Sequence, residues 1–223
     1  VLTEGAVLDI LNGSDNRLVS IYVESPLVWG IHVTAAGPVP AVEEGQRVAI
    51  SRFGSGSHLI AVVDAMMRGF DPSTMEFVVV DNIDGARTAL AEGRADIFLW
   101  ERHMTQPLVD SGEFRRIGER EVPWPAFVIS ARSDFLGTNA GALRTALDIV
   151  ATYCKKLKDD DDSVRLISDA CEIAPADAER WLAGVRWTND RQQPTAALER
   201  IKSALISQGA IEPTATIDTL WSR

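Results

Sequence analysis

Residues 48–58, with the sequence VAISRFGSGSH, are an apolar run followed by a glycine- and serine-rich turn that opens a helical stretch. Glycines let the backbone approach a ligand closely, and the unpaired N–H groups at a helix start attract polar or anionic groups. The stretch therefore predicts one wall of a ligand site, to which five residues would contribute: Arg52, Ser55, Gly56, Ser57 and His58. The alternative is that Ser55 or Ser57 only caps the helix.

On both sides of this turn, short apolar runs alternate with helical stretches, which is the pattern of βαβ units and a largely parallel sheet. The predicted strands are 47–51, 75–81 and 96–100, and the predicted helices are 57–68, 85–92 and about 102–111. Residues 34–44, rich in Ala, Pro and Gly, are predicted to cross between two lobes. After residue 135 the apolar spacing predicts a run of helices without an intervening strand.

A second candidate wall is the strand ADIFLWE, residues 95–101, which ends in an aromatic side chain and a carboxylate. Ligands of open α/β sheets bind at the carboxyl ends of the strands. Trp100 could stack on a flat ligand, and Glu101 could accept a hydrogen bond from an amine or a hydroxyl. The alternative is that Trp100 is part of the core.

Further candidates follow from their position along the chain. Glu4 and Asn82 lie on loops that follow predicted strands, where polar side chains could reach a ligand. Ser25 and Trp124 lie in Pro-broken runs assigned to the crossings between lobes, and crossing segments border a cleft. The alternative for such tryptophans is packing at the hinge without ligand contact.

Composition limits the other classes of function. The chain has 223 residues, enough for two lobes of roughly 100 residues each. Its formal net charge of -10 and the lack of a basic stripe argue against nucleic acid as a partner. No apolar run approaches the roughly 20 residues of a membrane span, so direct membrane insertion is not expected.

Metal, cofactor and catalytic signals are also missing from the sequence. His32, His58 and His103 are scattered through different elements without a metal-ligand spacing, and we expect no metal and no cofactor. Cys154 and Cys171, 17 positions apart, are interpreted as two buried thiols, with a disulfide or a metal site as the alternatives. No pairing of a nucleophile with a base is evident, so we do not expect an enzyme.

At these residues the sequence resembles the type 2 periplasmic-binding-protein-like family, in particular the binding proteins for nitrate, sulfonate and taurine and those related to thiamine-pyrimidine precursors. The resemblance is strongest at GQRVAISRFGSGSH, GRADIFLWE and PWPAFVISARSDF. IYVESPLVWGIHV and ISRFGSGSH look like a branch of uncharacterised fungal and bacterial chains. Glu101 is followed by Arg102 and His103 where the family pattern has a proline, which puts the contact geometry of Glu101 in doubt.

The resemblance implies a two-lobed α/β fold of the periplasmic binding protein type 2 kind. Lobe 1 would comprise residues 1–34 and 128–223 with a helical C-terminal tail, and lobe 2 would comprise residues 35–127. The opening Val1-Leu2-Thr3-Glu4 looks like a strand end, so we expect an incomplete first lobe with exposed apolar surface. The compartment stays open: periplasmic or lipid-anchored for a bacterial member, cytoplasmic for a fungal-type member.

The function implied is that of a solute-binding protein that clamps a small polar organic molecule between its lobes. A sulfonate, an amine or zwitterion, or a pyrimidine-like molecule fits the predicted contacts, and an ABC transporter permease would be the protein partner. Two alternatives remain: an enzyme related to pyrimidine-precursor synthesis, and the ligand-sensing domain of a regulator.

Overall fold

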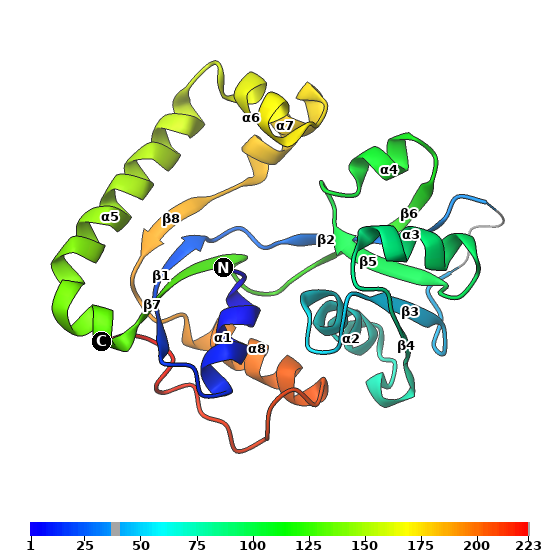
Figure 1. The fold of residues 1–223 in the computed structure, drawn as a ribbon, viewed down its shortest axis with the longest axis horizontal. Coiled ribbons are helices and arrows are strands. Elements are labelled where there is room, and N and C mark those ends of the chain that lie inside the picture. The colour runs from blue at the N-terminus through cyan, green and yellow to red at the C-terminus, as the bar shows by residue number, and fades with distance from the viewer. Residues whose placement is uncertain (37–40, 223) are drawn as a thin grey trace. The chain divides into compact units, whose positions relative to one another are not determined.

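A computed structural model describes residues 1–36 and 41–222. The chain divides into two compact units, each with its own sheet (Figure 1). Unit 1 comprises Val1–Pro26, Pro123–Lys202 and Thr214–Arg223, and unit 2 comprises Leu27–Val122 and Ser203–Pro213. None of the described helices is long and apolar enough to cross a membrane.

Unit 2 is built on a five-stranded sheet with the order β4-β3-β5-β2-β6. The strands are β2 (Val28–Thr34), β3 (Arg47–Ile50), β4 (Glu76–Val79), β5 (Ile97–Glu101) and β6 (Phe114–Glu121). β3 pairs in parallel with β4 and β5, as the βαβ pattern predicts, but β2 is antiparallel to both β5 and β6. The sheet is therefore mixed, because a strand from before the βαβ units and a strand from after them complete it.

Two helices cover opposite faces of this sheet, since successive residues of a strand point to opposite sides. Ala49 and Phe98 pack with the buried residues of α3 (Ile83–Ala91). Their neighbours Val48, Ile97 and Leu99 line a small cavity with Ala61 and Ala65 of α2 (Gly56–Arg68). Two short elements, the 3-10 helix η1 (Pro72–Thr74) and α4 (Gln106–Asp110), lie in the connections.

Unit 1 has a three-stranded sheet with the order β7-β1-β8. Its strands are β1 (Asn16–Val23), β7 (Phe127–Arg132) and β8 (Trp187–Asp190), and both pairings are antiparallel. Its helices are α1 (Thr3–Leu11), α5 (Ser133–Asp159), α6 (Ser163–Cys171) and α7 (Pro175–Gly184). α5 is kinked at Asn139, whose backbone is not helical.

β8 corrects the prediction that no strand interrupts the C-terminal helices. It has only four residues, Trp-Thr-Asn-Asp, and this sequence has no alternation of apolar and polar residues. None of the four is fully buried: three are half-buried and one is exposed. Its position is set by pairing with β1. The last helix, α8 (Thr195–Ser207), buries Leu198 and Ile201 in unit 1 and continues into the segment that belongs to unit 2.

The boundaries of the units differ from the predicted lobes. The chain leaves unit 1 after Pro26, not within 34–44, because Val28–Thr34 pairs with β5 and β6 of unit 2. Ser203–Pro213 also belongs to unit 2, which the predicted boundary at residue 128 did not include. Residues 37–40 of the predicted crossing lie outside the described residues.

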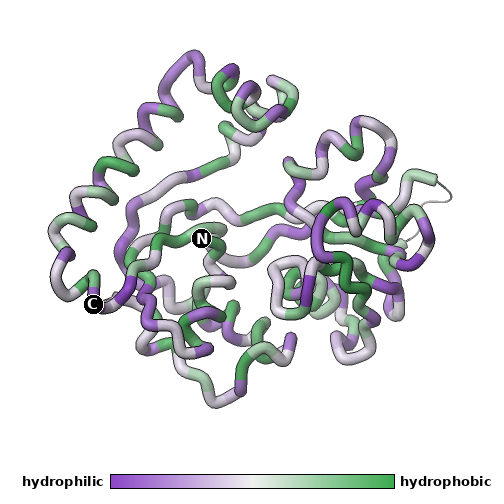
Figure 2. Tube along the Cα trace, in the orientation of Figure 1, coloured by the Kyte–Doolittle hydropathy of each residue, from purple (hydrophilic) through white to green (hydrophobic). Residues whose placement is uncertain are grey.

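Unit 1 carries large apolar side chains on its surface. Polar and apolar residues alternate along α5 in Figure 2, and Phe135, Ile149 and Tyr153 are exposed there, as is Leu166 of α6. Whether the lobe is incomplete remains a prediction.

Candidate functional site

The turn between β3 and α2 is shaped by a glycine and a serine. Gly54 has a φ of +76°, in the left-handed region that side chains rarely adopt. Ser55 is extended, with φ -81° and ψ 169°, and its Oγ accepts a hydrogen bond from the His58 N–H at 3.3 Å. Ser55 is therefore the N-cap of α2, as the capping alternative predicts.

The serine hydroxyls of the turn bond to one another. Ser57 Oγ accepts from the Ser51 N–H at 2.9 Å and lies 3.3 Å from Ser51 Oγ and 3.0 Å from Ser55 Oγ. Ser57 is only 2% exposed. In this arrangement the Ser57 hydroxyl fixes the turn to the end of β3 and does not face solvent.

Two backbone N–H groups at the start of α2 have no hydrogen-bond acceptor among the described residues. The first N–H groups of a helix lack intrahelical acceptors. Ser55 takes those of His58 and Leu59, whereas those of Gly56 and Ser57 find no acceptor among the described residues. Arg52, on the same turn, is exposed. Positive charge and free N–H donors at a helix start are features that favour the binding of an oxyanion.

His58 ties this turn to a distant part of unit 2. Its Nδ1 accepts hydrogen bonds from the Gly54 N–H at 3.1 Å and from Gln208 Nε2 at 2.7 Å, so the proton of the neutral ring is assigned to Nε2. Burial lowers the pKa of His58, and the ring packs edge-to-face on Phe77 at 4.6 Å. His58 is a support of the turn, and its partner Gln208 is 150 positions away, where no local pattern marks it.

Trp100 and Glu101 follow the predicted strand β5. Trp100 is half-buried and stacks on Phe98 with a centroid distance of 5.2 Å, so one face of its ring belongs to the core. The indole N–H groups of Trp100 and Trp29 are buried without an acceptor among the described residues. Glu101 Oε2 accepts from the Met104 N–H at 2.8 Å and thereby shapes the loop after the strand.

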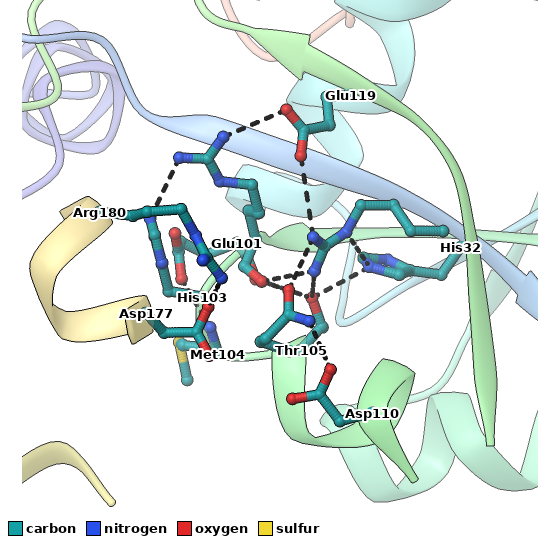
Figure 3. A network of polar contacts seen from close by, with 12 residues as sticks. His32, Glu101, His103, Met104, Thr105, Asp110, Glu119, Asp177 and Arg180 are labelled. Carbon is teal, nitrogen blue, oxygen red and sulfur yellow. Dashed lines mark hydrogen bonds and ion pairs between the residues drawn. The ribbon is translucent and has the colours of Figure 1, made fainter. Parts of the chain in front are cut away.

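A buried histidine, His32, contacts this loop through Thr105, as Figure 3 shows. His32 is 0% exposed; its Nδ1 lies 3.3 Å from the Phe98 carbonyl, and its Nε2 lies 3.0 Å from Thr105 Oγ1 and accepts from Arg116 Nε at 3.3 Å. Burial and the Arg116 charge lower the pKa of His32 to about 4. The sequence did not indicate this network, because His32 lies within the apolar run of β2 and its partners are distant along the chain.

Asn82 caps the other helix that follows a parallel strand. Its Oδ1 accepts from the N–H groups of Asp84 and Gly85, both at 3.0 Å, at the start of α3. The side-chain oxygen predicted to contact a ligand is therefore occupied by the helix itself. Asp81, directly before it, has a φ of +62°.

The remaining candidates, Glu4, Ser25 and Trp124, lie in unit 1 and are all buried. Trp124 Nε1 donates to Glu4 Oε2 at 3.0 Å, and burial raises the pKa of the Glu4 carboxyl. Ser25 Oγ accepts from the Arg186 N–H at 3.0 Å. These side chains hold unit 1 together in this structure, and a role in ligand contact stays a prediction for them.

Within residues 1–36 and 41–222, no three His, Cys, Asp or Glu side chains are placed to hold a metal ion. Cys154 and Cys171 are both free thiols. Cys154 is buried as predicted, whereas Cys171 is exposed, because it is the last residue of α6 and lies outside the buried side of that helix.

Comparison with known proteins places the fold. Residues 29–120 match the sequence model of the Ca3427-like PBP family. The Candida albicans CA3427 gene product, described as having the generic periplasmic binding protein fold, is similar with a TM-score of 0.82 and 23% identity over 98% of this chain and 74% of its own. No match was found among curated protein sequences.

Two sulfonate-binding proteins are also similar in structure. The alkanesulfonate-binding protein SsuA from Xanthomonas axonopodis pv. citri, bound to MOPS, has a TM-score of 0.79 and 16% identity, covering 97% of this chain and 77% of its own. The putative sulfonate ABC transporter protein SsuA from Methylobacillus flagellatus has a TM-score of 0.74 and 15% identity, covering 97% and 69%. The predicted resemblance and the periplasmic binding protein fold are thereby confirmed.

Proposed function

We propose that the protein is a solute-binding protein, and that the start of α2 in unit 2 holds the anionic end of a small polar organic molecule. The observation that carries the proposal is that the N–H groups of Gly56 and Ser57, close in sequence to the exposed Arg52, have no acceptor among the residues that the structure describes. An oxyanion accepts two or three hydrogen bonds at such a helix start and is stabilised there by the helix dipole.

The similar structures support a sulfonate as the first ligand class to test. SsuA from Xanthomonas is described as an alkanesulfonate-binding protein and is bound to MOPS, itself a sulfonate. A sulfonate group has three acceptor oxygens and one negative charge, which matches two N–H donors and a guanidinium. Trp100, whose ring stacks on Phe98 and meets Trp29 edge-to-face, would cover the apolar part of the ligand with its exposed part.

The resemblance also implies closure of two lobes on the ligand and delivery to an ABC transporter, and the Methylobacillus protein is described as part of a sulfonate ABC transporter. Both features are part of the proposal. Neither is needed for the test that follows, because all the groups it changes lie in unit 2.

The test is to remove one N–H donor without disturbing the helix. Gly56 is the first residue of α2, where proline is well tolerated, and the extended backbone of Ser55 is the conformation required before a proline. Gly56→Pro should weaken binding of an alkanesulfonate about tenfold or more, since a hydrogen bond to a charged group contributes about 1.5–3 kcal/mol. Gly56→Ala retains the N–H and is the matched control.

Affinities would be measured by calorimetry after a thermal-shift screen over sulfonates, carboxylates, amino acids, amines and pyrimidines. Arg52→Ala should also weaken an anionic ligand. Two results would contradict the proposal: no compound raises the melting temperature, or Gly56→Pro binds the best ligand as tightly as Gly56→Ala does.

A further inference from the structure

Unit 1 contains a pocket of about 590 Å³ between the end of α5, the residues after α7, and β8. All its lining residues belong to unit 1, so it is separate from the proposed site at α2. Pockets that bind small molecules have volumes of about 300–1,000 Å³. The lining residues used below are Ala151, Cys154, Lys155, Val185, Trp187 and Arg186.

The pocket has an apolar wall with an aromatic side chain held in place. Ala151 of α5 and Val185 are the aliphatic part. Trp187 is half-buried and packs edge-to-face on Trp181, with a centroid distance of 5.7 Å and an interplanar angle of 73°. A tryptophan fixed in this way presents a flat apolar surface without a large loss of side-chain freedom when a ligand binds.

One cation of the pocket is uncommitted. Lys158 Nζ donates hydrogen bonds to the carbonyl groups of Leu182 and Val185, and Arg186 forms an ion pair with Glu24 at 3.6 Å. Lys155, which is exposed at the same pocket, forms no ion pair within the part of the chain that the structure describes. Two carboxylates, Glu24 and Asp159, also line the pocket, and Glu24 is neutralised by Arg186. The lining still holds three cations against two carboxylates, so the charge at Lys155 favours an anionic group there.

A thiol lies in the wall between these two features. Cys154 is 9% exposed, and its Sγ donates to the Tyr22 hydroxyl at 3.7 Å. Its reactivity therefore reports on access to the pocket. Cys171, which is exposed and lies outside the pocket, is an internal control in the same molecule.

We propose that this pocket is a second ligand site, which takes a small aromatic carboxylate or sulfonate with its ring against Trp187 and its anionic group at Lys155. The proposal does not depend on the site at α2, because it rests on unit 1 alone. It gives the protein a second place at which an organic anion is recognised.

The first test measures affinity with naphthalene-1-sulfonate as the probe. Lys155→Glu replaces the attracting charge by a repelling one, and we expect its affinity to be at least about tenfold weaker than that of the wild type. Lys156→Glu is the matched control. This substitution changes the net charge by the same amount, but Lys156 lies over the Tyr153 ring and is not a lining residue of the pocket. Equal affinities of the two variants in calorimetry would overturn the proposal.

The second test locates the probe by the two thiols. Reagent and time are chosen so that iodoacetamide labels both thiols of the free protein, and labelling is followed by mass spectrometry. With the probe at ten times its dissociation constant, labelling of Cys154 should slow about tenfold while that of Cys171 stays unchanged. An unchanged rate at Cys154, or equal slowing at both thiols, would contradict the proposed site.

Ala151→Trp offers an independent check, since it fills the pocket from the α5 side. It should abolish probe binding, whereas Thr152→Trp, on the next and exposed position of α5, should not. Gly56→Pro should leave the Cys154 protection unchanged, which separates this site from the one proposed at α2. Loss of the protection in Gly56→Pro would show that the probe acts through α2 and would overturn the second site.

Discussion

The starts of α2 and α3 differ, although both helices follow parallel strands of the same sheet and both begin with a polar cap. Asn82 at α3 accepts two N–H groups with one side-chain oxygen and so closes that helix start. Ser55 at α2 accepts one N–H with its side chain, and those of Gly56 and Ser57 have no acceptor within the described part of the chain. A strand followed by a polar turn and a helix is thus not enough to define a ligand site.

The two helix starts differ in which groups accept hydrogen bonds from their first N–H groups. At α2 the hydroxyls of Ser51, Ser55 and Ser57 bond to one another, so they hold the backbone in place and leave its N–H groups free. At α3 the cap side chain is exposed and consumes the donors itself. The comparison predicts that changes at α3 affect stability alone, while changes at α2 affect stability and binding.

The largest effect on stability is expected at Gly85, in the first turn of α3. Its N–H donates to the Asn82 cap, and its Cα packs closely against the backbone of Val80. A Cβ on Gly85 would lie 1.9 Å from the Val80 carbonyl oxygen, so the backbone must move. Gly85→Ala should lower the free energy of unfolding by about 3 kcal/mol in urea titrations. Gly141→Ala in α5, where nothing lies within 4 Å, is the control and should not destabilise. Equal stability of the two variants would refute this close contact.

An effect of similar or smaller size is expected for His32, on the α3 face of the sheet next to Phe98 and Phe114. Its pKa is lowered to about 4 in the folded protein, so below pH 6.5 the unfolded chain binds a proton that the folded chain does not. Stability from this group is therefore complete above pH 6.5 and falls by up to about 3 kcal/mol as the pH drops to 4.

Chemical unfolding at several pH values would check this, with His32→Gln as a variant that retains hydrogen-bonding groups but does not titrate. The pH dependence between 6.5 and 4 should be weaker in the variant than in the wild type. Parallel curves for the two proteins would show that His32 does not ionise as described.

The smallest effects compare the serine that supports the start of α2, Ser57, with the N-cap of α3, Asn82. Ser57→Ala leaves the buried Ser51 N–H without its acceptor and should cost about 2 kcal/mol of stability. Asn82→Ala removes an exposed cap and should cost about 1 kcal/mol. Only Ser57→Ala should also weaken the ligand found in the calorimetric screen. If Asn82→Ala weakened that ligand as much, the distinction between the two helix starts would fail.

The sequence predicted the βαβ core well, because β3, α2, β4, α3 and β5 have local patterns that agree with their final environment. It did not predict the assignment of β2 to unit 2, since an apolar run broken at Pro26 carries no information about its partners. β8 was missed for a related reason: four half-buried or exposed residues become a strand only through pairing with β1.

For the candidate site, the sequence indicated the turn that we propose as the ligand site, but it did not show which polar groups of the turn are bonded within the protein. Ser57 and His58 were predicted as ligand contacts, with helix capping by Ser57 and packing of His58 as the alternatives, and in the structure their polar atoms bond to Ser51, Gly54 and Gln208. Backbone N–H groups are invisible in a sequence, and so is a partner 150 positions away. Ligand contact remains a prediction for every one of the candidate residues.

The hydrogen bond between His58 and Gln208 affects how this protein can be dissected. Residues 29–120, which match the family model, contain the whole turn but not Gln208. A shortened chain ending near residue 122 would contain every predicted ligand residue of unit 2 and would still lack the side chain that anchors the turn. Weak binding by such a fragment would therefore report a missing anchor and not a missing site.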